Sequence, residues 1–301
     1  MQPHRHASSD KGLDGHAGHD HDQGLAHDLA VLQQRRRALG LLAGLAGMGG
    51  LALVGCGGGG SETGTTVTGS TGSGSGTGTG TGATGSCSVI PEETAGPYPG
   101  DGSNSNGSGV ANALALSGIV RSDIRSSIGT ASGTAGGVPL TLTLKLVNTG
   151  SSCADLSGYA IYLWHCDREG RYSLYSSGVT AENYLRGVQT TGSDGTVTFT
   201  TIFPGCYDGR MPHMHFEVYR NTSAATSYAN KIKTSQIAFP TDVCSTVYNG
   251  ASGYSASITN FNRITFATDN VFSDGYTTPL AATSGSVAAG YTAALTVGIA
   301  A

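Results

Sequence analysis

The sequence has few charged residues and a single tryptophan. Charged residues make up 12% of its 301 residues, and the formal net charge at pH 7 is -4. The lysines and arginines form no basic stripe, which argues against a nucleic-acid partner. After residue 87 no long hydrophobic pattern of helical period occurs, which argues against a mainly helical fold. The abundant serine, threonine and glycine suit an exported surface.

The first 55 residues have the features of an export signal. Residues 1–30 are polar and rich in histidine and aspartate, and arginines occupy positions 35–37. The apolar stretch 38–54 is too short and too weakly hydrophobic for a spanning helix. Consecutive arginines before such a stretch indicate a twin-arginine signal peptide. The run Leu53-Val54-Gly55-Cys56 resembles a lipobox. We therefore expect an exported lipoprotein, anchored in a membrane through Cys56 and facing the periplasm or the cell exterior. An ordinary secretory signal or an uncleaved anchor is the alternative.

The rest of the chain divides into a linker and one domain. Residues 57–86 are almost entirely glycine, serine and threonine, a composition that forms a flexible tether after Cys56. Residues 87–301 have the length of a single domain. Leucines at 140, 142, 144 and 146 alternate with polar residues, as in a half-buried strand, and 158–166, 196–203, 213–219 and 291–299 have similar patterns. The expected fold is all-β, an antiparallel β-sandwich.

A tyrosine and two histidines lie close together in the run 204–215. His213 and His215 are two apart in a predicted strand, so both imidazoles point to the same face. Neutral imidazole is a common ligand for borderline metal ions. The phenol of Tyr207 binds a metal well only as phenolate, which a strongly charged hard cation favours. The pattern favours ferric iron over zinc or magnesium. Two surface histidines beside a turn are the alternative.

Motifs around this run carry a resemblance to a known family. Residues 164–172 fit the pattern W-x-x-D-x-x-G-x-Y, residues 185–190 fit L-R-G-x-Q-T, residues 199–207 fit F-x-T-I-x-P-G-x-Y, and residues 209–215 fit G-R-x-x-H-x-H. In this order and spacing they resemble the intradiol ring-cleavage dioxygenases, the family of catechol and protocatechuate dioxygenases. The resemblance covers about residues 89–239 well. It implies the same β-sandwich fold.

The resemblance assigns roles to five residues of the site. It implies that Tyr172 is the tyrosine that stays on the metal and that Tyr207 is the one that substrate displaces. His213 and His215 correspond to the two histidine ligands. Arg210 corresponds to the arginine that stabilises the charged substrate complex. Tyr207 and Arg210 are therefore the expected catalytic residues.

Five further positions are candidates for contact with substrate. Pro97 and Tyr98 lie in a segment similar to the family's Thr-x-Gly-Pro-Tyr segment at the mouth of the site. Gln236 lies where the family often has a pocket glutamine. Trp164 and Arg186 belong to the matching motifs. The alternative for Trp164 is core packing, and the alternative for Arg186 is a solvated charge at a strand end.

The resemblance implies a reaction as well as a site. The expected cofactor is non-haem Fe(III), with no organic cofactor. The expected substrates are dioxygen and a small aromatic diol of the catechol type. Both atoms of O2 would enter the product, a muconate-type diacid. One chain carries all four expected ligands, so an oligomer is possible but is not needed for the site.

Two other classes of function stay open at this point. One is a non-catalytic β-sandwich binding module, for instance for surface glycans. The other is a different metalloenzyme, with copper or zinc on His213 and His215 alone. The complete set of two tyrosines and two histidines favours the dioxygenase. Tyr175 and Tyr184 are neighbouring alternatives to Tyr172 as a ligand.

The cysteines are consistent with an oxidising compartment. Six are present, of which one is assigned to the lipid anchor. The odd number that remains leaves one cysteine without a partner where disulfides persist. The expected pairs are Cys206 with Cys244 and Cys87 with Cys153. Cys166 then stays unpaired and buried.

Overall fold

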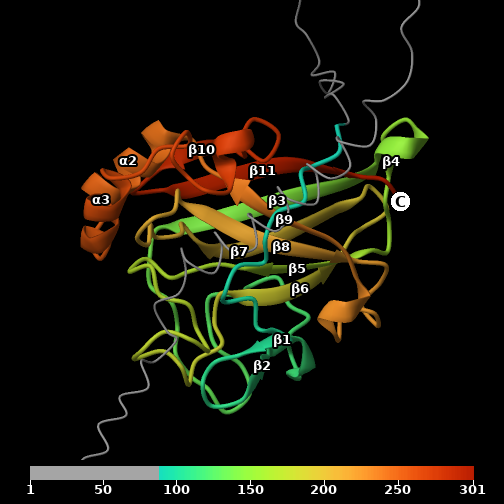
Figure 1. Ribbon diagram of the computed structural model, residues 1–301, viewed down its shortest axis with the longest axis horizontal. Coiled ribbons are helices and arrows are strands. Elements are labelled where there is room, and N and C mark those ends of the chain that lie inside the picture. The colour runs from blue at the N-terminus through green and yellow to red at the C-terminus, as the bar shows by residue number, and fades with distance from the viewer. Residues whose placement is uncertain (1–87) are drawn as a thin grey trace, which may run out of the picture.

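Two stacked β-sheets form the body of the protein (Figure 1). The structure is a computed structural model, and it describes residues 88–301. The five-stranded sheet has the order β10 (Ala282–Ser286), β11 (Gly290–Ile299), β3 (Pro139–Asn148) and β4 (Ala154–Asp155), and β7 (Thr196–Ile202) also pairs with β3. The four-stranded sheet has the order β6 (Arg186–Thr190), β5 (Ala160–Trp164), β8 (His213–Tyr219) and β9 (Lys231–Ala238).

Smaller elements surround the two sheets. The hairpin of β1 (Asp101–Ser105) and β2 (Val110–Asn112) lies below the four-stranded sheet in the view of Figure 1. Two helices, α2 (Thr241–Gly250) and α3 (Ser255–Phe261), lie together at the left of that view. Four single turns of 3-10 helix complete the described part of the chain: η2 (Ala113–Ala115), η3 (Thr149–Ser151), η4 (Tyr228–Asn230) and η5 (Phe272–Asp274).

The main core lies between the two sheets. The four leucines of β3 are at most 1% exposed, whereas Thr141 between them is exposed. They pack in one cluster with apolar residues of the other strands, including Leu163 from β5, Phe199 from β7 and Phe216 from β8. Alternating strand residues point to opposite faces, so a period of two apolar residues buries one face of each sheet. The predicted all-β sandwich is confirmed.

The strand directions differ from the prediction in one place. β11 pairs with β3 in parallel, from Tyr291 opposite Leu140 to Ile299 opposite Asn148. The other pairings between named strands are antiparallel. A parallel neighbour requires a long crossover between the two strands, and the chain between β3 and β11 supplies one. An alternating pattern fixes which face of a strand is buried but carries no information about its direction.

The four-stranded sheet is buried on both faces. Its second face carries Tyr162, Trp164 and Val188, which pack with Ala113 and Leu114 from the amino-terminal part of the domain. All seven residues of β8 are buried as a consequence. This second face, rather than the sandwich core, holds the polar side chains of β8.

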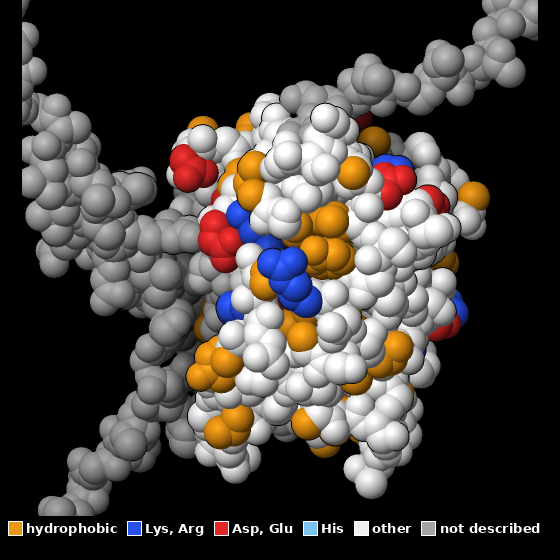
Figure 2. All heavy atoms as spheres, turned by 90° about the vertical axis from the view of Figure 1, so that its right-hand side faces the viewer, with side chains coloured by type: hydrophobic (Ala, Val, Ile, Leu, Met, Phe, Trp, Pro, Cys, Tyr) orange, Lys and Arg blue, Asp and Glu red, His pale blue; other side chains and the backbone are white. Residues whose placement is uncertain are grey.

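One face of the molecule is shown in Figure 2. White, which marks the backbone and the uncharged polar side chains and glycine, covers most of it, and a small group of Lys and Arg side chains lies beside a hydrophobic patch. Few charges of either sign are visible on this face, as the low charge of the sequence predicts. No helix among the described residues is long and apolar enough to cross a membrane.

The cysteines correct one prediction. Cys206 and Cys244 are buried and free, so the predicted bond between them is wrong. The Cys206 thiol instead lies 3.3 Å from the carbonyl oxygen of Arg210 in its own turn. Cys166 is free and buried, as predicted. Cys153 is disulfide-bonded, and its predicted partner Cys87 lies outside the described residues.

The two faces of β3 give a test of the core. We expect Leu142→Ala to lower the free energy of unfolding by about 2–5 kcal/mol, because it leaves a cavity between the sheets. Thr141→Ala, on the exposed side of the same strand, should change it by less than about 0.5 kcal/mol. Urea unfolding of the two variants measures both values. Equal losses would contradict this assignment of the faces.

Candidate metal centre

The alternation of β8 places the two histidines together. Met214 and Phe216 point into the core between the sheets. His213 and His215 therefore share the opposite face. Their Nε2 atoms lie 3.0 Å apart, and each side chain is 2% exposed. The predicted orientation of the imidazoles is confirmed.

The surroundings of His213 fix which of its nitrogens carries the proton. Nδ1 lies 2.6 Å from the carbonyl oxygen of Met211. A carbonyl only accepts, so Nδ1 carries the hydrogen and Nε2 keeps its lone pair. Burial, together with the positive charge of Arg210, lowers the pKa of His213 well below its usual range. Burial and the neighbouring His213 do the same to the pKa of His215. Both imidazoles are neutral at pH 7, which is the protonation state that binds metals.

Two tyrosines complete a cluster of four rings. Tyr207 follows β7 in the turn before β8, and its hydroxyl lies 3.3 Å from Nε2 of His213. Tyr172 comes from the loop after β5, and its ring centroid is 5.8 Å from that of Tyr207 and 6.2 Å from that of His215. Tyr172 is 1% exposed, and burial raises its pKa well above the usual range. Its hydroxyl has no hydrogen-bond partner in the described structure.

The neighbouring tyrosines are engaged elsewhere. The Tyr175 hydroxyl donates to Oδ1 of Asn104 at 2.6 Å and accepts from the Gly100 amide at 2.8 Å. The Tyr184 hydroxyl donates to Oδ2 of Asp167 at 3.2 Å. Both phenols are satisfied by protein partners, whereas that of Tyr172 is not. The geometry thus favours Tyr172 over these two alternatives as a ligand.

The residues of this cluster fit a metal ion. Buried polar atoms are nearly always paired, so an unpaired phenol beside two converging imidazole nitrogens requires an explanation. A cation between them would satisfy the Nε2 lone pairs and the Tyr172 oxygen together. It would also favour the phenolate form that burial alone opposes. No group of three or more histidine, cysteine or carboxylate side chains forms a metal site among residues 88–301, so the tyrosines are needed to complete this one.

Arg210 is buried beside the two imidazoles. Its Nη2 donates to Oε1 of Gln236 at 2.6 Å, and its Nε donates to Oδ2 of Asp269 at 3.1 Å. The guanidinium carbon also lies 5.8 Å from the ring centroid of Phe272. Gln236 is fully buried on β9, and its Nε2 donates to the carbonyl of Thr94 at 2.9 Å. Gln236 thus links Arg210 to the amino-terminal segment.

Residues 94–99 form a covering segment across the site. Gly96 lies directly against His215: a Cβ there would be 3.3 Å from Cε1 of the imidazole. The backbone of Gly96 has φ +67°, a conformation that favours glycine. Tyr98 packs on Tyr172 with ring centroids 4.8 Å apart. Pro97, which lies between Gly96 and Tyr98 in the chain, is partly exposed. The segment predicted to lie at the mouth of the site does lie beside the ligand candidates.

Arg186 is placed differently from the prediction. It is 1% exposed, so it is no solvated charge. Its Nε donates to the Ser173 hydroxyl at 3.0 Å, and its Nη1 donates to the Pro99 carbonyl at 2.7 Å and the Tyr162 hydroxyl at 3.2 Å. Its Nη2 donates to the carbonyls of Tyr98 at 3.0 Å and Ser173 at 2.9 Å. All its donors are used within the protein, so Arg186 fastens the covering segment to the Tyr172 loop instead of contacting substrate.

Trp164 is fully buried and packs against a ligand candidate. Its ring stacks on that of His215, with centroids 5.0 Å apart and an interplanar angle of 4°. On the same sheet face it stacks on Tyr162 with centroids 5.0 Å apart. Trp164 therefore serves in core packing, the alternative given for it above, and supports the His215 ring. It offers no exposed edge to substrate.

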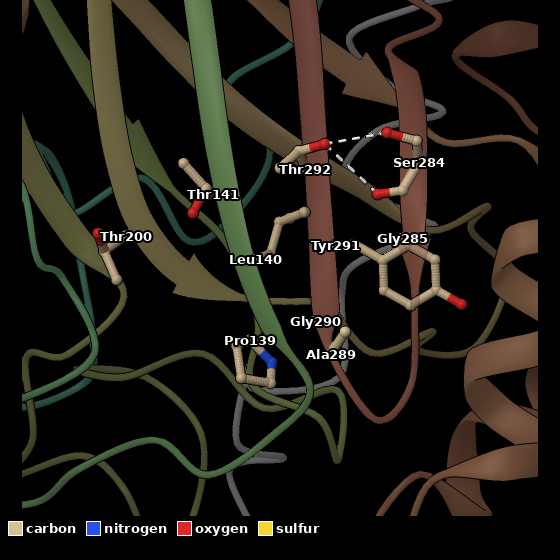
Figure 3. A pocket seen from close by; sticks show the side chains of 10 residues that line it. All are labelled: Pro139, Leu140, Thr141, Thr200, Ser284, Gly285, Ala289, Gly290, Tyr291 and Thr292. Carbon is tan, nitrogen blue, oxygen red and sulfur yellow. Dashed lines mark hydrogen bonds between the residues drawn. The ribbon is translucent and has the colours of Figure 1, made fainter.

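Shallow grooves elsewhere lack comparable chemistry. One of about 250 Å³ lies at the end of β3 and β11, where Pro139, Thr141, Ser284 and Thr292 line it (Figure 3). Another of about 370 Å³ adjoins it over Thr143 and Ala294. Neither is lined by a histidine, a carboxylate or an amine. The candidate site therefore stays with the four-ring cluster.

Comparisons with known proteins agree with this geometry. The family Dioxygenase_C, described as dioxygenase, matches residues 121–244. An intradiol ring-cleavage dioxygenase from Tetranychus urticae has a similar structure, with a TM-score of 0.53, 25% identity, and coverage of 71% of this chain and 95% of that one. The chain belongs to the intradiol ring-cleavage dioxygenase family. It is thus an enzyme of the oxidoreductase class.

More distant structures resemble it less. The dioxygenase domain of a dioxygenase carbohydrate-binding fusion from Streptomyces sp. SirexAA-E has 21% identity and a TM-score of 0.42, covering 70% of this chain and 98% of that one. The 3-chlorocatechol 1,2-dioxygenase from Rhodococcus opacus 1CP has 15% identity and a TM-score of 0.42, covering 69% of this chain and 72% of that one. Among curated proteins, no sequence matches this chain.

Sequence reasoning missed several residues around the dioxygenase site. Asp269 and Phe272 come from the segment after α3, far along the chain from the matching motifs. Ser173 and Thr94 act through a carbonyl or a hydroxyl, which no side-chain motif reveals. The contact between Asp269 and Arg210 depends on tertiary packing of distant segments, so no local pattern in the sequence indicates it.

Gly96 gives a test of the covering segment. Gly96→Ala places a methyl group against the His215 ring, whereas Gly129→Ala, at φ +71° with open space around it, causes only backbone strain. We expect both variants to lose about 1–2 kcal/mol of stability. Only Gly96→Ala should also weaken binding of Co²⁺ to the metal-free protein, measured by calorimetric titration. Equal cobalt affinities in the two variants would show that the ring has room to move.

Proposed function

We propose that this enzyme is a non-haem Fe(III) dioxygenase that cleaves catechol-type aromatic diols with O2 to muconate-type diacids. The observation that carries the proposal is the convergence of two neutral imidazoles with two phenols, one of which is buried without a partner. Membership of the dioxygenase family supports the reaction class.

Four side chains would hold the iron. They are Tyr172, Tyr207, His213 and His215, which supply two phenolates and two neutral nitrogens. A trivalent ion matches this set because two anionic oxygens in a buried site need a compensating positive charge. When bound, ferric iron would act as a Lewis acid that holds and orients the ionised diol. Copper or zinc on the histidines alone would leave the Tyr172 oxygen unpaired.

The protein's own groups divide the remaining work. Tyr207 is the less buried of the two phenols, so its oxygen is the better placed to take up a proton from an entering diol. Arg210 holds a positive charge next to the imidazoles and stabilises negative charge that develops on the substrate. Tyr98 and Gly96 cover the site from the amino-terminal side and exclude water there.

A visible spectrum tests this proposal. We expect the full-length protein loaded with Fe³⁺ to show a broad visible band from phenolate-to-iron charge transfer. Catechol added without oxygen should shift the band to longer wavelength, and admitted O2 should be consumed with catechol one to one as a muconate forms. A protein that stays colourless with iron and leaves catechol intact would reject the proposal.

Two tyrosine variants make the test specific to the site. Tyr172→Phe should weaken the band and lower kcat/KM more than about 100-fold, since it removes an iron ligand. Tyr175→Phe, one turn of chain away with its hydroxyl bound to Asn104, should keep both the band and the activity within a few-fold. If the effects of the two variants were exchanged, Tyr175 would be the ligand.

We also propose that the enzyme works outside the cytoplasm, tethered through an acylated Cys56. The support is the lipobox-like run before Cys56, the arginines at 35–37 and the glycine-, serine- and threonine-rich stretch that follows. A disulfide at Cys153 is in keeping with an oxidising compartment. Mass spectrometry of the mature amino terminus should find lipid on Cys56, and Cys56→Ala should release the protein from membranes. An unmodified Cys56 within an uncleaved chain would contradict this.

A further inference from the structure

We infer that Asp269 is a positioning residue for the proposed iron site, acting on Arg210 and His213 at once. This inference rests on the proposed function. Asp269 lies outside the matched family region, residues 121–244, in the segment between α3 and η5. It is fully buried, and its carboxylate contacts the guanidinium of Arg210 and the amide of Met211, both in the loop that leads into β8.

The carboxylate accepts four hydrogen bonds. Oδ2 accepts from Nε of Arg210 at 3.1 Å and from the amide of Met211 at 2.6 Å. Oδ1 accepts from the amides of Val271 at 2.8 Å and Phe272 at 3.0 Å. One oxygen is thus held by its own turn, and the other is presented to the loop that leads into β8.

The first contact fixes a charge. Arg210 is 1% exposed, and its partner Asp269 is the carboxylate that balances its charge at 3.1 Å. With Gln236 holding Nη2, the guanidinium is fastened at two points and stands over the Phe272 ring. A buried charge held in this way is preorganised and needs no rearrangement when substrate charge develops.

The second contact reaches the metal ligand through the backbone of Met211. Asp269 accepts from the Met211 amide, and the Met211 carbonyl accepts from Nδ1 of His213 at 2.6 Å. The amide and the carbonyl of Met211 flank its Cα in two different peptide groups, so the carboxylate acts by fixing the backbone that presents the carbonyl to His213. The hydrogen on Nδ1 is therefore held firmly, which leaves Nε2 as the metal-binding nitrogen and raises its basicity.

Asparagine cannot replace this aspartate. Each carboxylate oxygen faces donors, so an amide must point its NH2 group at one of the two pairs. The amides of Val271 and Phe272 belong to the local turn and retain the oxygen most easily. The NH2 group then faces Arg210 and Met211, and both contacts are lost.

The experiment compares Asp269→Asn with a matched substitution elsewhere. Asp101 is also fully buried, accepts from the Ser103 amide at 2.9 Å and lies 4.0 Å from Nζ of Lys231. Asp101→Asn therefore removes the same charge from a similar setting away from Arg210. In metal-free, 15N-histidine-labelled protein, we expect Asp269→Asn to move the Nδ1–H resonance of His213 upfield and to speed its exchange with water. Asp101→Asn should leave this resonance unchanged.

Metal affinity is the second readout. We expect Asp269→Asn to weaken Co²⁺ binding about 10–100-fold, as loss of a carboxylate behind a histidine ligand does. Asp101→Asn should bind Co²⁺ like the unmodified protein. Neither measurement uses catechol, so a failure of the proposed dioxygenase reaction would not be mistaken for a failure of this inference.

Asp269→Asn leaves the buried charge of Arg210 without its carboxylate, and the variant could fail to fold for that reason. A second pair of variants covers this case. Neither Arg210→Gln nor the double variant Arg210→Gln/Asp269→Asn contains the buried arginine, and in Arg210→Gln the Asp269 carboxylate keeps its three backbone amide donors. The double variant should still bind Co²⁺ about 10–100-fold more weakly than Arg210→Gln alone, with the same shift of the His213 resonance. Equal affinity and an unmoved resonance in that pair would overturn the inference.

Discussion

The spacing of two residues between His213 and His215 is the constraint on which the rest of the structure depends. It sends both imidazoles to one face of β8 and sends Met214 to the sandwich core. Two buried nitrogens 3.0 Å apart need either a shared proton or a common cation, because two facing lone pairs with neither between them would be left unsatisfied. The second face of the sheet must therefore be covered, polar and closely fixed, and the loops around it meet those needs.

Two buried arginines do this work in different ways. Arg186 donates to the carbonyls of Tyr98, Pro99 and Ser173 and to the hydroxyls of Ser173 and Tyr162, which ties the covering segment to the Tyr172 loop. Its donors meet neutral carbonyl and hydroxyl oxygens. Arg210 is balanced by Asp269 and remains next to the imidazoles. Arg186 thus holds the segments that enclose the site, and Arg210 supplies a positive charge beside the imidazoles.

Local patterns in the sequence predicted the strands and the two histidines well. The β3 leucines and the β8 alternation depend only on the period of a strand, and the structure has both. The family motifs added Tyr172 and Tyr207, which no period reveals. The sequence could not predict the parallel pairing of β11, the free Cys206, the engagement of Arg186 or the contact with Asp269. Each of these depends on which distant segments pack together.

The geometry also explains why the two phenols would differ in behaviour. Tyr172 is held on three sides, by the Tyr98 ring, by the His215 ring and by a loop whose next residue, Ser173, is fastened to Arg186. Tyr207 is partly exposed, and its ring meets His213 edge-on in a turn that Gly209 closes at φ +78°. Removing Tyr172 from a metal would disturb all of those contacts, whereas the Tyr207 side chain already reaches solvent in part. The proposed roles, a phenol that stays and a phenol that leaves, are therefore in keeping with the packing of the two side chains.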